Sequence, residues 1–316
     1  MIISRTPFRI SFFGGGTDYP EYYLKYGGQV LGTSIDKYCY ISIRHLPPFF
    51  THKHRIVYSR VEYINELSKI KHPVVRAVLQ HLNVQEGLEI HHDADLPARS
   101  GIGSSSSFSV GFLHAMKAFH GEMVMKSDLA LSAMKLERDI LNECVGHQDQ
   151  MFAAHGGFNK ISFRQDGVID LEPVTIAHER LEQFHSHLML FFTGFSRHAS
   201  EVAKSQIQNI NKRKKHLKRM GQMVDEAILI LNNPKTSIDK LGKLLHEAWS
   251  LKRNLSNKVT TNEIDAIYEQ GLQAGAIGGE DSGSGRRRLY FVLCSAGVSV
   301  ARERKVAQIG ARSISF

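Results

Sequence analysis

Two glycines followed by four serines form the stretch of this chain with the clearest chemical use. Gly101 and Gly103 lead into serines 104–107, and apolar residues then recur at one helical spacing, at Phe108, Phe112, Ala115, Met116 and Phe119. Residues 88–92 upstream have the composition of a short strand. Backbone N–H groups at a helix N-terminus have no partner within the helix, and the helix dipole favours negative charge there. We therefore predict that this loop holds a phosphate group.

Glycine–serine runs are also typical of flexible linkers, which is the plain alternative for this stretch. The strand before it and the amphipathic helix after it favour the phosphate site, because a linker would have neither. The loop is not a Walker motif, since no Gly-Lys-Ser/Thr follows, and it is not a dinucleotide fingerprint.

Two acidic residues downstream are candidates for catalysis or metal binding. Glu137 falls at the edge of an apolar stripe in a helix predicted over 127–141, with Ser127 as N-cap and a stripe of Leu129, Ala133, Leu136 and Ile140. A carboxylate there must be paired, hydrogen-bonded or metal-bound, and an interhelix salt bridge is the simpler alternative. Asp149 starts an apolar run and could act as a base if a cation, for which Arg9 is the candidate, kept it ionised. A helix-cap role for Asp149 fits equally well.

A triple glycine at residues 14–16 ends a strand predicted over 2–13. Thr17, Asp18 and Tyr19 follow, so the turn can present a carboxylate and a phenol to a polar ligand. The alternative is an ordinary turn in which Asp18 caps the helix predicted over 20–26.

The remaining patterns favour an α+β fold, because strands predominate early and helices late. Further strands are predicted over 30–35, 38–44, 158–163 and 187–192. Further helices are predicted over 74–82, 199–231, 238–255 and 262–271.

Composition limits the classes of function. The 316 residues are 42% hydrophobic and 22% charged, which is ordinary for a globular chain of one or two domains. A net charge of +9 suits anionic ligands without choosing among them. Three distant cysteines, Cys39, Cys144 and Cys294, and a charged N-terminus lead us to expect a reducing, cytoplasmic location. The basic block at 212–215 lacks interleaved aromatics, so we expect a solvated helix face, with no nucleic-acid or membrane partner.

Three motifs in order resemble those of the GHMP small-molecule kinases, and most closely the D-glycero-D-manno-heptose 7-phosphate kinases of bacterial surface-polysaccharide synthesis. The first covers residues 6–19, TPFRISFFGGGTDY, and the second covers 96–107, LPARSGIGSSSS. The third is GHQDQ at 146–150 with Gly156 and Gly157. The resemblance implies a ribosomal-S5-like N-terminal domain over 1–185 and a ferredoxin-like α+β C-terminal domain over 186–316, with the active site in the cleft between them.

The resemblance also implies cofactors and the residues that bind them. ATP phosphates would be wrapped by the second motif, at Pro97, Arg99, Gly101, Gly103, Ser104, Ser105 and Ser106. Mg²⁺ would be held by the hydroxyl of Ser104 or Ser105 together with Glu137. Phosphoryl transfer depends mainly on positioning and charge neutralisation, which a glycine loop, a metal carboxylate and one base can supply.

The implied reaction places phosphate on the anomeric hydroxyl of a heptose 7-phosphate, for nucleotide-activated heptose synthesis. Asp149 would be the base or orienting carboxylate with Arg9 beside it, and Gly16, Asp18 and Tyr19 would line the sugar site. The expected partners are ATP, a phosphorylated sugar and, as an open expectation, a second copy in a homodimer. The alternatives are a fucokinase- or galactokinase-like enzyme, or a catalytically impaired binding relative.

The third alternative arises because the family's last motif is degenerate from Glu280 onward. The family has a glycine-rich Gly-Gly-Lys turn, whereas this chain has Gly278, Gly279 and Glu280, followed by Asp281 and by three arginines at 286–288. Arginine side chains would crowd a turn built for bare backbone, which predicts impaired stability or catalysis. A reading-frame slip near codon 280 would account for the change, because glycine codons read one base off can encode arginine.

Overall fold

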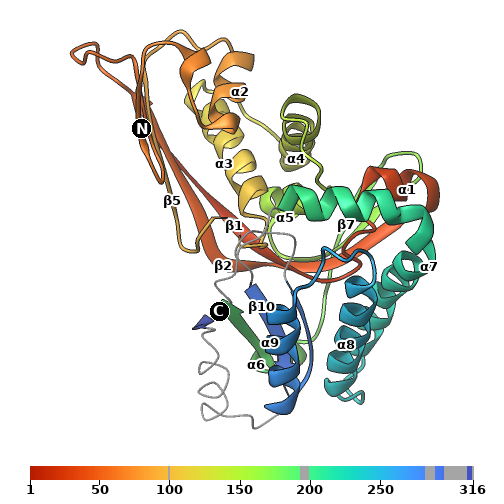
Figure 1. The fold of residues 1–316 in the computed structure, drawn as a ribbon. Coiled ribbons are helices and arrows are strands. Elements are labelled where there is room, and N and C mark those ends of the chain that lie inside the picture. The colour runs from red at the N-terminus through yellow and green to blue at the C-terminus, as the bar shows by residue number, and fades with distance from the viewer. Residues whose placement is uncertain (99, 193–198, 282–288, 295–311, 315–316) are drawn as a thin grey trace. The chain divides into compact units, whose positions relative to one another are not determined.

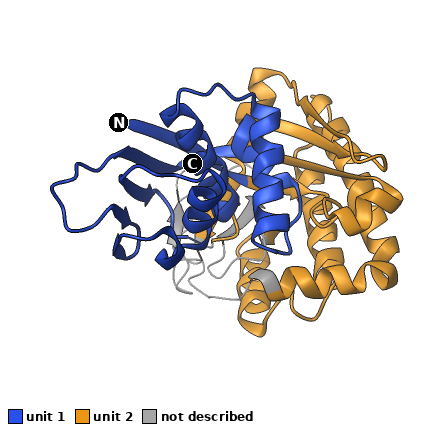
Figure 2. Ribbon diagram, turned by 90° about the horizontal axis from the view of Figure 1, so that it is seen from above, with its two compact units in different colours: residues 1–9, 34–98, 103–156 blue, residues 10–33, 99–102, 157–316 orange. Residues whose placement is uncertain are grey.

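The computed structural model describes residues 1–316 apart from 99, 193–198, 282–288, 295–311 and 315–316. Its residues divide into two compact units (Figure 2). Unit 1 comprises residues 1–9, 34–98 and 103–156, and unit 2 comprises residues 10–33, 99–102 and 157–316. Strands β1 (Ile2–Phe13) and β2 (Gly28–His45), labelled in Figure 1, each have residues in both units. The domain boundary predicted at residue 185 stays a prediction.

Unit 1 contains a sheet in the order β4-β3-β5-β2, with β1 paired to β2. Its further strands are β3 (His54–Val57), β4 (Val61–Ile64) and β5 (Leu88–Ala94). In this sheet β5 runs antiparallel to β2 and parallel to β3, so that Ile90 lies opposite both Ile43 and Ile56. These three side chains are at most 1% exposed and form part of the core. The elements β3 and β4 lie outside the prediction, because four-residue strands carry too little periodicity to be recognised.

The helical elements of unit 1 pack mainly against one another and build the site. They are η1 (Leu67–Lys69), α2 (Pro73–His81), α3 (Ser104–Phe119), α4 (Lys126–Lys135), η2 (Leu136–Ile140) and α5 (Gln148–His155). Helix α5 packs against both α3 and α4. Helix α3 lies close to β1 at Gly111, where an added Cβ would be 2.5 Å from Thr6 Oγ1 and where Ser4 Oγ donates to the Gly111 carbonyl. This contact brings the start of the chain against α3.

The predicted helix over 127–141 is interrupted, and the interruption determines where Glu137 lies. Helix α4 has its N-cap at Met125, so the prediction of Ser127 as N-cap is wrong. From Leu136 the chain forms a π-helical turn, η2, which takes one more residue per hydrogen-bonded ring and shifts side chains around the axis. Ile140 is consequently 39% exposed, whereas Glu137, predicted at the edge of the apolar face, is 1% exposed.

Unit 2 contains the first part of β2 paired with β6 (Phe158–Phe163), which pairs in turn with β7 (Ile169–Pro173). Its other sheet is antiparallel, in the order β11-β8-β10-β9, and consists of β8 (Leu188–Phe192), β9 (Ala276–Asp281), β10 (Leu289–Cys294) and β11 (Arg312–Ile314). Two strands were expected over 30–35 and 38–44, but β2 is one strand. Its alternation lapses at Asp36 and Lys37 because they lie between the segment paired with β6 and the segment paired with β5.

Helices make up most of the rest of unit 2. They are α1 (Pro20–Tyr26), α6 (His178–Ser186), α7 (Ala199–Asn232), α8 (Asp239–Arg253) and α9 (Asn262–Gln273). The last three, whose positions were predicted, bury a shared apolar cluster in which Trp249 is fully enclosed. None of the described helices combines the length and the hydropathy that a bilayer span requires. The predicted α+β class is confirmed.

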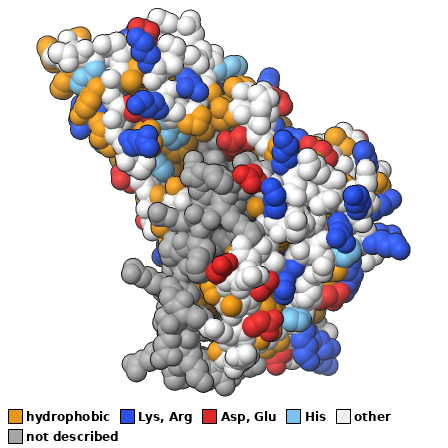
Figure 3. All heavy atoms as spheres, in the orientation of Figure 1, with side chains coloured by type: hydrophobic (Ala, Val, Ile, Leu, Met, Phe, Trp, Pro, Cys, Tyr) orange, Lys and Arg blue, Asp and Glu red, His pale blue; other side chains and the backbone are white. Residues whose placement is uncertain are grey.

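The basic block on α7 is exposed to solvent, as predicted for lysines and arginine at 212–215. Lys214 Nζ lies 4.0 Å above the Tyr26 ring, and Arg219 pairs with Glu226 and Glu247. On the face drawn in Figure 3, basic side chains are interspersed with acidic and apolar ones. These cations are therefore partly matched within their own unit.

Candidate active site

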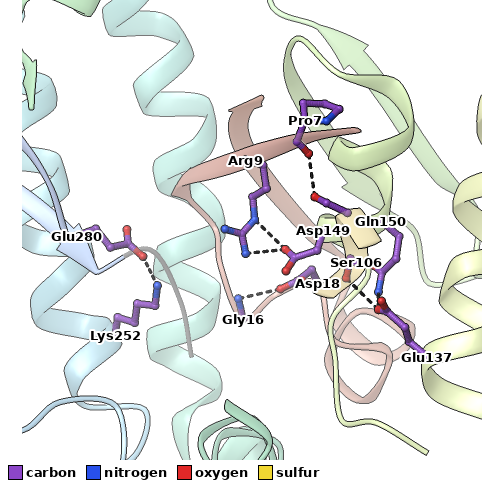
Figure 4. A network of polar contacts seen from close by, with 11 residues as sticks. Pro7, Arg9, Gly16, Asp18, Ser106, Glu137, Asp149, Gln150, Lys252 and Glu280 are labelled. Atoms are coloured by element: carbon purple, nitrogen blue, oxygen red, sulfur yellow. Dashed lines mark hydrogen bonds and ion pairs between the residues drawn. The ribbon is translucent and has the colours of Figure 1, made fainter. Parts of the chain in front are cut away.

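Arg9 and Asp149 form a close ion pair that joins β1 to the first turn of α5. Arg9 Nε and Nη2 lie 2.8 and 2.7 Å from the same oxygen, Asp149 Oδ1 (Figure 4). Arg9 is 6% exposed, whereas the Asp149 side chain is 27% exposed. The pair that the sequence predicted is thus present, and it orients a carboxylate that solvent can still reach.

The end of the glycine–serine loop lies directly against this pair. Gly103 is the N-cap of α3 and has left-handed backbone, with φ of 72°. A Cβ added to it would lie 3.3 Å from Arg9 Cγ and 3.5 Å from Asp149 Cγ. A side chain at Gly103 would therefore be strained by φ and crowded by the ion pair. Gly103, as the N-cap, has no side chain with which to cap α3, and the positive end of this helix favours an anion next to Asp149.

Glu137 is enclosed by neutral hydrogen-bond donors. Its Oε2 accepts from Ser106 Oγ at 2.9 Å and from Gln150 Nε2 at 2.5 Å (Figure 4). Burial raises the pKa of the Glu137 carboxyl to about 7, although the nearby Ser109 hydroxyl and the hydrogen bonds from Gln150 and Ser106 oppose the rise. The interhelix salt bridge considered as the simpler alternative is absent from the part of the chain that the structure describes.

These contacts close a ring of four elements within unit 1. Ser107 Oγ, next to Ser106 on α3, donates to the Pro7 carbonyl of β1 at 2.8 Å. Helix α3 thus bonds to β1 and to η2, while α5 bonds to η2 through Gln150 and to β1 through Asp149. The loop, the base candidate and the buried acid are held in one frame, which we call the polar ring.

The polar ring fits a divalent cation at Glu137. The second carboxylate oxygen of Glu137, Oε1, is buried and has no hydrogen-bond partner among the described residues. No group of three or more His, Cys, Asp or Glu side chains that could hold a metal occurs in that part of the chain. A hard cation such as Mg²⁺ needs no such group, because it commonly takes one or two carboxylates plus substrate phosphates and waters.

The serines are arranged differently from what the resemblance implied. Ser104 is half-buried and Ser105 is exposed, whereas the serine bonded to Glu137 is Ser106, predicted only as a phosphate contact. The metal-binding roles of Ser104 and Ser105 stay predictions. Two further phosphate-loop residues have simple placements: Pro97 is half-buried and Gly101 has φ of 82°. Arg99 lies outside the described residues.

The turn at residues 14–19 belongs to unit 2. Asp18 is 3% exposed, and its Oδ1 accepts from Gly16 N at 2.9 Å. The N-cap of α1 is Tyr19, so the alternative of Asp18 as helix cap is wrong. Tyr19 is 8% exposed and its hydroxyl lies 3.4 Å from Gln206 Oε1 on α7. Gly16 has φ of 97°, and a Cβ there would meet Leu217 at 3.2 Å.

The acid that replaces the family's lysine is also paired. Glu280 lies in β9, is 2% exposed, and forms an ion pair with Lys252 of α8. Just before it, Gly278 is packed so closely on α8 that an added Cβ would lie 2.0 Å from the Gly242 carbonyl oxygen. The three arginines at 286–288 lie outside the described residues.

Several polar residues of these sites were not singled out from the sequence. Gln150 and Ser107 complete the polar ring, Gln206 contacts Tyr19, and Lys252 neutralises Glu280. Gln150 stands beside Asp149 in the third motif, and this adjacency was the one available signal. The others carry no local pattern that separates them from ordinary surface residues.

Comparisons with known proteins identify chains that are similar to this one. The family described as GHMP kinases N terminal domain matches residues 68–157, which include α3, η2 and α5. A D-glycero-alpha-D-manno-heptose 7-phosphate kinase of Campylobacter jejuni is 26% identical over 305 residues, covering 92% of this chain and 88% of the relative. A galactokinase of Pyrococcus furiosus is 24% identical and covers 90% of this chain and 86% of the relative.

Solved structures show the same fold. A D-glycero-D-manno-heptose 1-phosphate kinase of Bacteroides thetaiotaomicron is similar with a TM-score of 0.80 at 21% identity, covering 100% of this chain and 95% of that one. A mevalonate kinase is similar with a TM-score of 0.71 at 19% identity, covering 99% of this chain and 98% of that one. Residues 68–157 therefore match the GHMP kinase N-terminal domain, and the chain has the fold of these solved kinases.

Proposed function

We propose that this protein is an ATP-dependent sugar kinase that phosphorylates the anomeric hydroxyl of a heptose 7-phosphate. The observation that carries the proposal is the close approach of Gly103, at the N-terminus of α3, to the Arg9–Asp149 pair. It brings a place for nucleotide phosphates next to a carboxylate that can receive a proton. Kinase relatives that cover about nine-tenths of the chain support the same reaction class.

Within the polar ring, the start of α3, Arg9 and Asp149 are the groups proposed to take part in this reaction. The N–H groups at the start of α3, with the loop before it, bind the transferred phosphates. Arg9 donates to Asp149 Oδ1. The other carboxylate oxygen, Oδ2, orients the sugar hydroxyl and accepts its proton as the sugar oxygen attacks phosphorus. Gly16, Asp18 and Tyr19 are the proposed sugar contacts.

Glu137, with Ser104 or Ser105, is the proposed site for Mg²⁺. The unpartnered Oε1 supplies a hard oxygen ligand, and its neutral surroundings leave a charge for the ion to balance. When bound, the ion would neutralise the charge that the phosphates develop. ATP and Mg²⁺ are accordingly the proposed cofactors, whereas a homodimer and a cytoplasmic location stay predictions.

Conversion of Asp149 to Asn tests the proposed base. Asp149→Asn keeps the shape and still offers an oxygen to Arg9, but it cannot accept the sugar's proton. We expect turnover to fall by about 10²–10⁴-fold. Calorimetric affinity for ATP should change little, because the phosphates contact α3 rather than Asp149. Turnover within a few-fold of the unmodified protein would remove Asp149 from the mechanism.

A panel of sugars tests the substrate, measured as ADP released with and without Mg²⁺. The similarity to heptose phosphate kinases predicts preference for heptose 7-phosphate over free sugars. The alternative of a fucokinase- or galactokinase-like enzyme is favoured by the matches to a galactokinase and to a fucokinase. Preference for unphosphorylated galactose or fucose would establish the galactokinase- or fucokinase-like alternative. Binding of ATP without formation of ADP in the presence of any sugar would indicate the catalytically impaired relative.

A further inference from the structure

Gln150 is a fully buried side chain that contacts the proposed metal ligand, Glu137. It is 0% exposed, and its Nε2 donates to Glu137 Oε2. The amide must face the carboxylate with its N–H, because its oxygen would bring two acceptors together. Ser106 Oγ donates to the same Oε2, so both neutral donors hold one oxygen and neither is bonded to Oε1.

The chemistry of the donor matters as much as its position. A lysine or arginine in place of Gln150 would fix the carboxylate but cancel its charge, and it would compete with a cation. A neutral amide fixes Oε2 and leaves the charge on the group. Glu137 thereby stays restrained in rotation, with the partnerless oxygen on its other side.

Gln150 also follows Asp149 directly on the first turn of α5. Consecutive helical residues point about 100° apart, so one turn sends Asp149 to Arg9 and Gln150 to Glu137. Helix α5 packs against both α3 and α4, which fixes this turn relative to the serines. A single rigid turn therefore sets the position of the base candidate and of the metal carboxylate together.

We infer that Gln150 is a positioning residue that holds Glu137 Oε2 and presents Oε1 as the ligating atom for the divalent cation. This inference rests on the proposed function, which places the metal at Glu137. Groups that hydrogen-bond a metal ligand typically change metal affinity by about 10–100-fold when they are removed. Gln150 would therefore affect metal binding without touching the metal.

The test measures Mn²⁺ binding to the full-length protein by the loss of its free EPR signal, in the presence of a non-hydrolysable ATP analogue. Gln150→Met keeps the side-chain volume and removes the donor, and we expect Mn²⁺ to bind about 10–100-fold more weakly. Affinity for the ATP analogue in EDTA should stay within about twofold, because Gln150 lies on Glu137 rather than on the loop. Gln150→Asn, whose amide is too short to reach Oε2, should give the same result and serves if the methionine variant does not fold.

Two serine variants give matched controls on one helix. Ser106→Ala removes the other donor to Oε2 and should weaken Mn²⁺ binding in the same direction. Ser107→Ala removes an equal hydroxyl that bonds Pro7 instead, and should leave Mn²⁺ affinity within about twofold even if the melting temperature falls. This contrast separates positioning from general loss of stability.

Glu137→Gln separates the inference from the function on which it rests. If Glu137→Gln loses Mn²⁺ binding while folded Gln150→Met and Gln150→Asn keep it within twofold, the inference is overturned and the metal site stands. If Glu137→Gln itself keeps Mn²⁺ affinity, the metal assignment is wrong and the inference falls with it. Weakened binding in Glu137→Gln and in the Gln150 variants, with Ser107→Ala unaffected, supports both.

Discussion

Glu137 and Glu89 are both buried carboxylates of unit 1, at 1% and 3% exposure, but different groups surround them. Glu89 on β5 faces two arginines, Arg44 and Arg55, and His91. Glu137 on η2 faces a hydroxyl and an amide. Arginines of the protein neutralise Glu89, whereas Glu137 receives hydrogen bonds but has no counter-charge among the residues that the structure describes.

The pKa of each group reflects this difference. Burial alone would raise the pKa of Glu89, but the hydrogen bond from His91 and the charges of Arg44 and Arg55 outweigh it and lower the pKa. Burial raises the pKa of Glu137 to about 7, because neutral donors compensate only in part. Ionisation of a buried acid without a nearby cation carries a large free-energy cost. The comparison supports the proposal that Glu137 binds a cation, whereas the charge of Glu89 is balanced by its own protein neighbours.

Replacing each glutamate by glutamine should separate these roles most strongly in turnover. Glu137→Gln keeps an oxygen for Ser106 and Gln150 but removes the charge that would hold Mg²⁺. We expect turnover to fall by about 10²–10³-fold, similar to the loss of one charge-stabilising group in other enzymes. Glu89 lies in the sheet, so Glu89→Gln should leave turnover of the folded protein within about threefold. Equal losses in the two variants would erase the distinction.

Glu280 in unit 2 extends the comparison, because Lys252 makes it resemble Glu89 rather than Glu137. Glu280→Lys, which introduces the family's usual residue, would place two buried ammonium groups together. We expect the free energy of unfolding to fall by about 3–5 kcal/mol, as when one partner of a buried pair is lost. The double variant Lys252→Glu with Glu280→Lys should recover most of that loss in urea titrations. A stabilised single variant would mean that the acid at 280 is foreign to this fold, as the frame-slip hypothesis holds.

The dependence of stability on pH should show the smallest effect and distinguish the two unit 1 acids by sign. Because the folded pKa of Glu137 lies above the value of 4.5 for a free carboxyl, the folded metal-free protein binds this proton more readily between pH 4.5 and 7. Its contribution to the free energy of unfolding therefore falls as pH rises through that window, by about 2–3 kcal/mol.

Urea unfolding at pH 5 and pH 8 without divalent cations measures this effect. Glu137→Gln should gain stability relative to the unmodified protein on going from pH 5 to pH 8. Glu89→Gln should lose stability by similar amounts at both values, because a lowered pKa keeps that carboxyl ionised throughout the interval. A pH-independent difference for Glu137→Gln would contradict the raised pKa.

The long elements and the order of motifs could be predicted from the sequence, because periodicity and glycine placement are local. Strand β1 and helices α1 and α7–α9 follow such patterns. The pairing of Arg9 with Asp149 could also be predicted, because an aspartate in an apolar run needs a nearby cation to stay ionised. The polar ring could not be predicted in full. It depends on the π-turn η2, which buries Glu137, and on Gln150, whose partner is 13 residues away in sequence and on another element.

The central proposal is that this protein transfers a phosphoryl group from ATP to a sugar, and ³¹P NMR of the product tests it most directly. The full-length protein is incubated with ATP, Mg²⁺ and D-glycero-D-manno-heptose 7-phosphate. We predict a new anomeric phosphate signal beside the retained 7-phosphate, with ADP formed in equal amount and no such signal from Asp149→Asn. ATP that stays intact, or that yields only ADP and inorganic phosphate, would contradict the account.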